Sequence, residues 1–179
     1  DKNYIEQLYV KYMASGEAQG KHKTELKAML VGKKVMLIAP GKSTSDEADK
    51  IAEFASQDGV VSVGINFVCP GFETDLIFVS NMRRFRELPP EIYPKCIVTS
   101  NIPTDEPYIK VNYFDLLLPN DVVRDNAGLM AINYLKSLEV HDIYLAGFDG
   151  YSHDSQQNYA LQSMDFAVKN AIADARNLG

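Results

Sequence analysis

The sequence predicts a three-layer α/β domain in which helices cover both faces of a doubly wound, mostly parallel sheet. From residue 34 onward, short apolar runs that end in Gly, Ser, Asn or Asp alternate with stretches of helical periodicity. The runs at 60–65 and 76–79 are apolar almost throughout, which is typical of strands covered on both faces. Strands that alternate with helices favour right-handed crossovers and a parallel sheet. We therefore expect a Rossmann-like topology.

Six strands are expected in this domain, separated by helices. The strands are residues 35–39, 60–65, 76–79, 96–99, 108–112 and 142–146, with 108–112 at an edge. The helices are residues 46–56, residues 83–88, a helix capped by Asp125 or Asn126 that runs to Leu138, and a closing helix over about 155–177.

An amphipathic arm precedes the sheet. Apolar and aromatic side chains recur there at helical spacing, at Tyr4, Ile5, Leu8, Tyr9 and Tyr12. Small and polar residues at 15–20 predict a hinge, and a second helical patch ends at Gly32, where glycine can close a helix in the left-handed conformation. We expect residues 1–32 to form a helical arm or linker and residues 33–179 to form the nucleotide-binding-type domain.

Composition excludes several classes of function. The chain has 179 residues and a formal net charge of -6, so it lacks the concentrated basic face that a nucleic-acid partner needs. Its two cysteines have no CxxC spacing, and no stretch is long and apolar enough to cross a membrane. These features predict a cytoplasmic protein with structural thiols. The first residue is Asp1 rather than Met, which is typical of a piece excised from a longer protein.

Polar residues follow almost every expected strand. In open parallel sheets ligands bind beyond the carboxyl ends of the strands, so these residues are candidates for a ligand site. They are Gly41, Lys42, Ser43, Thr44, Asn66, Ser80, Asn81, Ser100, Asn101, Asn112, Gly147, Asp149, Gly150, Tyr151, Ser152 and His153. Amides and hydroxyls read bases, sugars and phosphates without carrying charge. The alternative is that they serve turns and helix caps.

The loop at residues 39–44 leads from a strand through Gly, Lys and hydroxyl side chains into a helix. Such a loop can offer backbone amides to an anion. It is not a Walker A motif, because Met36 stands where that motif has its first glycine, and it lacks the three spaced glycines of the dinucleotide fingerprint. Phosphate contact and simple turn or capping duty both remain open for Gly41 to Thr44.

Asp149 and His153 are candidate catalytic residues, as an acid/base pair in the loop after the last strand. The alternative is that Asp149-Gly150 forms a turn and that Asp154 caps the following helix. No histidine has a metal-binding spacing, so no metal site is expected in this segment.

Three arginines at 83, 84 and 86 follow Ser80 and Asn81. A solvated helix face accounts for them, although an arginine directed into the site could hold a phosphate or carboxylate.

The residues 125–151, together with the loop that begins at Pro40, resemble the nucleotide-binding core of the family 42 sialyltransferases and the pterin diphosphokinase-like fold. In those families a glycine-rich loop, an asparagine after the second strand, a Ser-Asn pair and a small-residue helix start surround the nucleotide. The resemblance implies ligand contacts here by Gly41, Ser43, Asn66, Ser80 or Asn81, Asn126, Gly147 and Asp149.

A larger part of the chain, including the tyrosine-rich residues 3–12, resembles the carboxyl-terminal domain of HMG-CoA lyase-like proteins classed as 4-hydroxy-2-oxovalerate aldolases. Its landmarks are the segments 37–43 (LIAPGKS), 77–81 (IFVSN) and 145–152 (LAGFDGYS). The resemblance implies an upstream TIM barrel in the same chain, whose HxH pair and Asp hold a divalent metal and carry out the aldolase reaction. It implies no cofactor in this segment.

Three functions follow as expectations. The first is a binding module for a nucleotide, a sugar nucleotide or a similar phosphate ester, beside a carbon-carbon lyase. The second is an assembly domain, with a possible homo-oligomer formed through the arm. The third is a glycosyl- or phosphoryl-transferring enzyme, with Asp149 or His153 as base and the 41–44 loop on the leaving phosphate.

Overall fold

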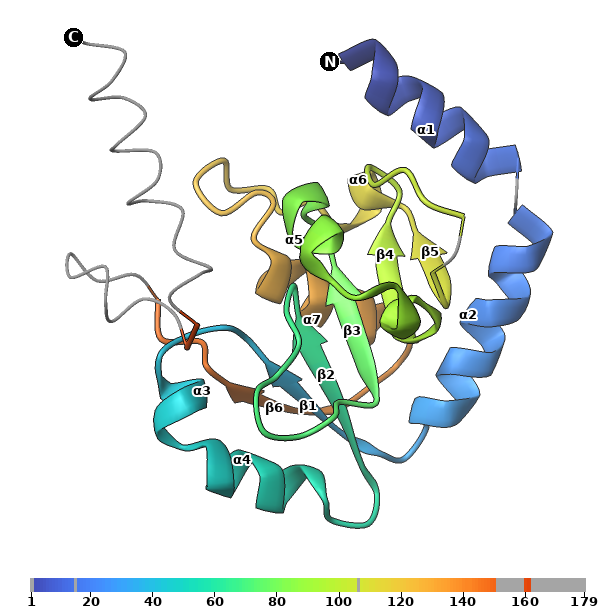
Figure 1. Cartoon of the computed structure of the whole chain (residues 1–179). Coiled ribbons are helices and arrows are strands. Elements are labelled where there is room, and N and C mark those ends of the chain that lie inside the picture. The colour runs from blue at the N-terminus through green and yellow to red at the C-terminus, as the bar shows by residue number, and fades with distance from the viewer. Residues whose placement is uncertain (1, 15, 106, 151–159, 162–179) are drawn as a thin grey trace, which may run out of the picture.

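The computed structural model describes residues 2–14, 16–105, 107–150 and 160–161. It contains one six-stranded sheet in which every pair of neighbours is parallel, in the order β5-β4-β3-β2-β1-β6 (Figure 1). The strands are β1 (Lys34–Ile38), β2 (Val60–Ile65), β3 (Leu76–Val79), β4 (Cys96–Thr99), β5 (Ile109–Val111) and β6 (Asp142–Ala146). The predicted α/β, Rossmann-like fold is confirmed.

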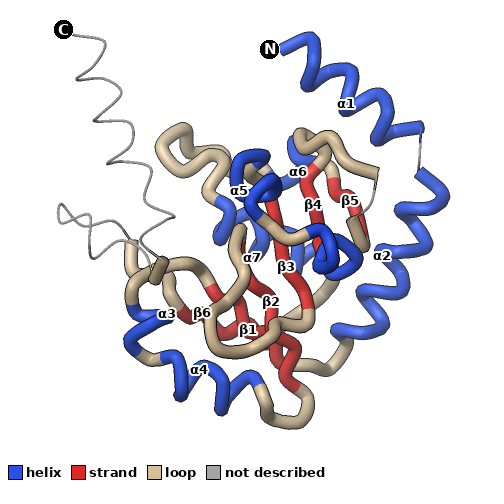
Figure 2. Tube along the Cα trace, in the orientation of Figure 1, coloured by secondary structure: helices blue, strands red, loops and turns tan. Residues whose placement is uncertain are grey.

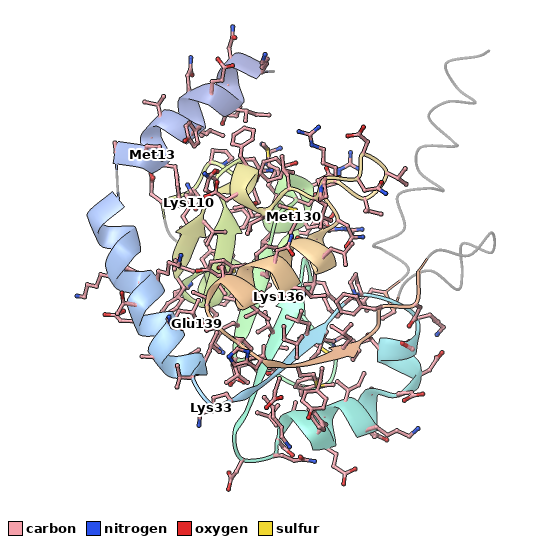
Figure 3. All side chains as sticks on the ribbon, turned by 180° about the vertical axis from the view of Figure 1, so that it is seen from behind. Met13, Lys33, Lys110, Met130, Lys136 and Glu139 are labelled. Carbon is pink, nitrogen blue, oxygen red and sulfur yellow. The ribbon has the colours of Figure 1, made fainter. Side chains whose placement is uncertain are left out.

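Helices surround this sheet (Figure 2). They are α1 (Lys2–Ala14), α2 (Gly16–Leu30), α3 (Ser43–Asp46), α4 (Ala48–Ala55), α5 (Met82–Glu87), the 3-10 helix η1 (Pro90–Lys95), α6 (Tyr113–Leu116) and α7 (Ala127–Ser137). One face of the sheet packs against α2, α6 and α7, and the other packs against α4, α5 and η1. Figure 3 shows α7, with Met130, lying across the first face. Crossovers in opposite directions along the sheet place their helices on opposite faces because each crossover is right-handed.

Both faces of the central strands are buried, which explains their continuous apolar runs. In β1, Val35 and Leu37 belong to the core under α2 and α7, whereas Met36 and Ile38 belong to the core under α4. Alternate side chains of a strand point to opposite faces, so a strand covered on both sides is apolar at most of its positions.

Two expected elements differ from the structure. The helix expected at 46–56 begins earlier and is broken into α3 and α4, because Glu47 between them has φ -116° and ψ 25°. The hinge expected at 15–20 is wrong for residues 16–20, which are helical in α2. Glycine in a helix costs only about 1 kcal/mol, which packing of the same helix can offset. The closing helix expected at 155–177 lies outside the described residues apart from 160 and 161, which are not helical.

The second half of the arm is part of the packed core. Leu26 and Leu30 of α2 are 0% and 1% exposed, in the cluster that covers the sheet. The helix ends as expected at Gly32, whose φ is +70°. By contrast, α1 has no buried residue, and its contacts with the domain include the Tyr9–Phe114 ring pair and the Lys11–Asp105 ion pair of 2.7 Å. The arm is therefore anchored mainly by α2.

Within the described residues, no helix is long and apolar enough to cross a membrane.

Replacing Leu30 by Ala should lower the free energy of unfolding by about 2–5 kcal/mol, because it leaves a cavity in the main core. Met29, its neighbour on the exposed side of α2, is 38% exposed. The control Met29→Ala should therefore change stability by less than about 1 kcal/mol. Urea denaturation of both variants measures the difference, and equal losses would contradict the docking of α2.

Burial raises the pKa of the Cys69 thiol to about 11 and that of the Cys96 thiol to about 12. At pH 8 both thiols should therefore react very slowly in the folded protein, because the thiolate is the reactive form. Unfolding in guanidinium should expose both thiols, so that both then react fast. A colorimetric thiol assay at pH 8 checks this, and rapid labelling of the folded protein would contradict it.

Candidate functional site

The sheet reverses its strand order at β1. The chain builds β1 to β5 in one direction and then returns to place β6 on the other side of β1. In open parallel sheets this switch point is where a crevice forms beyond the carboxyl ends of the strands. The two loops that leave these strands contain residues 39–44 and 147–149, both of which the sequence singled out.

Backbone hydrogen bonds hold the two loops together. The amide of Ala39 donates to the carbonyl of Ala146 at 2.8 Å, and the amide of Gly41 donates to the carbonyl of Gly147 at 3.0 Å. A Cβ on Gly41 would lie 2.2 Å from the Gly147 oxygen. Gly147 itself has φ +71°, and a Cβ there would lie 2.1 Å from the Ala39 oxygen. Both positions therefore require glycine.

The Asp149 side chain connects the two loops of this site. One oxygen of its carboxylate accepts a hydrogen bond from the Ser43 amide at 2.7 Å, and the other accepts from the Ser43 hydroxyl at 2.5 Å. Hydrogen bonds to an ionised acceptor are shorter and stronger than neutral ones. The loop thus directs two donors at one anion, and the chain itself supplies that anion.

The other loop side chains point elsewhere. The Thr44 hydroxyl is buried and donates to the Ala39 carbonyl at 2.7 Å. The Lys42 ammonium lies 3.1 Å from the Asp46 carboxylate and 3.3 Å from the Ser45 hydroxyl. Thr44 therefore serves the turn, whereas Lys42 is held in a half-exposed ion pair beside the site.

A hollow of about 440 Å³ opens next to the Ser43–Asp149 pair, between the α3–α4 segment and β6. Its lining includes Ser43, Asp149, Glu47, Lys50, Leu145 and Phe148. The sequence did not single out Glu47, Lys50 or Phe148. Glu47 and Lys50 follow the loop by less than two helical turns, and this spacing was the only signal available for them.

The polar ends of β2, β3 and β4 form a separate group. Asn66 has φ 59°, and its side-chain oxygen accepts from the Ser80 amide at 3.0 Å. The Asn101 amide group donates to the Ser80 carbonyl at 3.1 Å, and the Thr99 hydroxyl donates to Asn101 at 2.6 Å. These side chains satisfy the backbone where the strands end, as the turn alternative predicted.

Three asparagines are helix caps. Asn81 accepts from the Arg84 amide at 3.1 Å, Asn112 from the Phe114 amide at 3.2 Å, and Asn126 from the Leu129 amide at 3.1 Å. Asn126 also lies close to the switch point, because a Cβ on Gly128 would touch both Phe148 and the Asn126 side chain. The candidate residues thus form two groups. Gly41 to Ser43, Gly147 and Asp149 lie together at the switch point, and Asn66, Ser80 and Asn81 lie apart from them.

Arg84, the next candidate, is engaged away from the site. Arg84 is buried, and its guanidinium lies 3.5 Å from Glu87. Tyr151 and His153 lie outside the described residues. Within the described part of the chain, no group of three or more His, Cys, Asp or Glu residues could hold a metal ion.

Comparison with family models, with curated proteins and with solved structures finds no match for this chain. Both resemblances therefore stay predictions.

Replacing Gly41 by Ala should separate the two loops and lower the free energy of unfolding by about 1–3 kcal/mol, because the new methyl group overlaps the Gly147 backbone. Gly20 of α2 is the matched control, since a Cβ there meets nothing within 4 Å. Gly20→Ala should raise stability by about 0.5–1 kcal/mol. Denaturant titration should show these opposite signs, and a neutral Gly41→Ala would refute the close approach.

Proposed function

We propose that this domain is a binding module for a phosphate-bearing small molecule, such as a nucleotide, a sugar nucleotide or a similar phosphate ester, held at the β1–β6 switch point. The observation that carries the proposal is the convergence of the Ser43 amide and hydroxyl on the Asp149 carboxylate. Two donors that converge on a carboxylate are arranged to receive an anionic group. A phosphate oxygen would take the place of the carboxylate.

The surroundings support an exchange of anions. Asp149 is exposed and follows a glycine-containing loop, so its side chain can swing away when a ligand arrives. Gly41 exposes its backbone without a Cβ, which lets a phosphate approach closely. The Lys42–Asp46 pair is partly exposed, and such pairs contribute only about 0–1 kcal/mol, so Lys42 can turn to a phosphate at little cost.

Binding is favoured over chemistry by the partners of Ser43. A serine nucleophile is usually activated by histidine, whereas the Ser43 hydroxyl donates to a carboxylate, which is ordinarily a weaker base. Among the described histidines, His22 lies in α2 against Tyr108, and His141 precedes β6 at the opposite end of that strand. We therefore expect this site to hold a ligand rather than to transform it.

We further propose that the module belongs to a longer lyase, downstream of an aldolase barrel that carries the metal and the carbon-carbon chemistry. The resemblance of residues 37–43, 77–81 and 145–152 supports this assignment. The cysteines fit a cytoplasmic location, because Cys69 and Cys96 are both free, as expected where thiols stay reduced.

Calorimetry with ADP, CMP, UDP-glucose and pyrophosphate tests the binding proposal. Ser43→Ala should weaken binding about tenfold, since it removes one hydrogen bond to a charged group. Asp149→Ala should tighten binding about tenfold, because the competing carboxylate is gone. Lys42→Ala should weaken binding, whereas Lys136→Ala on α7 should have no effect.

Each variant is checked for an unchanged circular dichroism spectrum before titration. Absence of binding in both the wild type and Asp149→Ala would reject a phosphate site at the switch point. Weaker binding by Asp149→Ala would show instead that the carboxylate contacts the ligand.

A further inference from the structure

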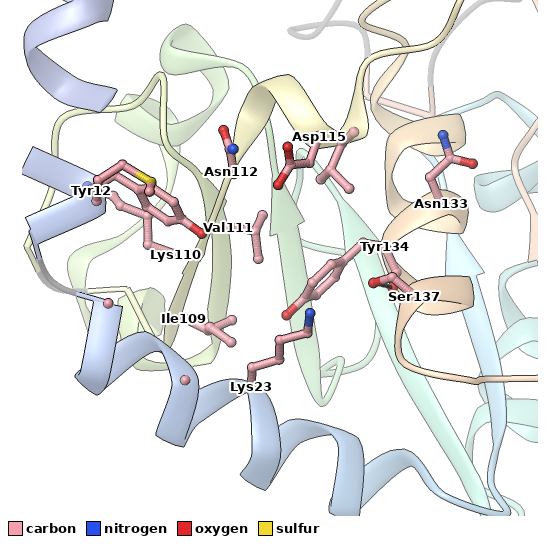
Figure 4. Close-up of a pocket in the computed structure, with 14 residues that line it drawn as sticks. Tyr12, Lys23, Ile109, Lys110, Val111, Asn112, Asp115, Asn133, Tyr134 and Ser137 are labelled. Atoms are coloured by element: carbon pink, nitrogen blue, oxygen red, sulfur yellow. Dashed lines mark hydrogen bonds between the residues drawn. The ribbon is translucent and has the colours of Figure 1, made fainter. Parts of the chain in front are cut away.

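A second cavity, of about 430 Å³, lies between the arm and the domain (Figure 4). Its walls come from α1 and α2 on one side and from β5, α6 and α7 on the other. Because β5 and β6 are opposite edges of the sheet, this cavity is separate from the switch point. Its volume lies within the range of small-molecule sites, about 300–1,000 Å³.

The floor of the cavity is apolar. Ile109 and Val111 of β5 are 3% and 6% exposed, and Leu116 of α6 is 5% exposed. Met13 of α1 faces the same space from the arm. A ligand here can therefore bury an apolar body of modest size.

Tyr134 places an unpartnered donor in this apolar site. The residue is only 4% exposed, and its hydroxyl has no hydrogen-bond partner within the described part of the chain. A buried hydroxyl without a partner is costly, and native proteins normally satisfy such groups. Burial raises the pKa of Tyr134 well above its ordinary value, so the hydroxyl keeps its proton and acts as a donor.

The charges around the cavity are unevenly placed. Lys23 reaches from α2 toward Tyr134, while Asp115 lies across the cavity on α6 (Figure 4). Lys23 has no ion-pair partner among the described residues, whereas the Lys110 ammonium donates to the Thr104 carbonyl at 2.5 Å. Burial raises the pKa of the Tyr12 phenol, and the nearby Asp115 charge raises it further. The Tyr134 end therefore offers one donor and one available cation.

We propose that this cavity binds a small amphipathic carboxylate. Its carboxylate accepts a hydrogen bond from the Tyr134 hydroxyl and pairs with Lys23, and its apolar body lies over Ile109, Val111 and Leu116. A free phosphate fits less well, because it leaves the apolar floor uncovered and carries a second charge opposite Asp115. The site does not depend on the ligand of the switch point.

Calorimetry with 3-phenylpropionate as the probe tests this inference, with 3-phenylpropanamide and inorganic phosphate as comparison compounds. The wild type should bind the carboxylate saturably, and the amide and phosphate at least about tenfold more weakly. Amide chemical shifts should move at residues 109–116 and 134 and stay unchanged at 41–44, which distinguishes this cavity from the switch point.

Tyr134→Phe should weaken binding of the carboxylate about tenfold, because the hydroxyl that donates to it is removed. The same change should raise the Tm of the protein without ligand, because the unpartnered hydroxyl is no longer buried. Lys23→Gln should weaken binding about fivefold or more, since it removes the cation. The matched controls Tyr108→Phe and Lys21→Gln, which do not line the cavity, should bind as the wild type does.

Three results would overturn the inference. They are no saturable binding of the carboxylate up to about 10 mM, equal affinity for the carboxylate and its amide, and unchanged affinity in Tyr134→Phe. The Tm of Tyr134→Phe shows in the same experiment that the variant is folded.

Discussion

The arrangement of this molecule depends on the pairing of β1 with a parallel strand on each side. Lys34 to Ile38 pair in register with β2 and also with β6, although β6 comes more than a hundred residues later in the sequence. Because β6 pairs with β1, it forms the edge of the sheet opposite β5. The pairing also brings the loop after β6 against the loop after β1, so the switch point exists only because these two strands pair.

This constraint explains the chemistry of the two loops. The hydrogen bonds between β1 and β6 continue past the strands through Ala39 and Gly41. They bring the two loop backbones so close that a Cβ on Gly41 or Gly147 would overlap the opposite loop. The same approach carries Asp149 to the Ser43 amide and hydroxyl. The pairing register of β1 and β6 thus accounts for two features. It requires glycine at positions 41 and 147, and it places the Asp149 carboxylate against two donors of Ser43.

The sequence predicts the central strands well because burial on two faces leaves a clear apolar signal. It predicts the switch-point loops because Gly41 and Gly147 stand shortly after the apolar runs of β1 and β6. It could not show which polar residues meet at the switch point and which bond to the backbone at the ends of β2, β3 and β4. From its position after a strand, Asn66 is predicted to contact a ligand. In the structure its backbone is left-handed and its side-chain oxygen accepts from the Ser80 amide. The break between α3 and α4 at Glu47 likewise could not be predicted from helical periodicity.

The cavity between the arm and the domain could not be predicted from the sequence, for a different reason. Periodicity places Tyr134 on the inner face of its helix, but the fate of its hydroxyl depends on how α2 docks across β5. Within the described residues, the buried side-chain atoms without a partner are the Tyr134 hydroxyl and His22 Nδ1, and both lie where the arm meets the domain. At the switch point, by contrast, the donors of Ser43 are satisfied by Asp149. A ligand at the switch point must therefore displace an internal partner, whereas a ligand under the arm would supply one that the fold lacks.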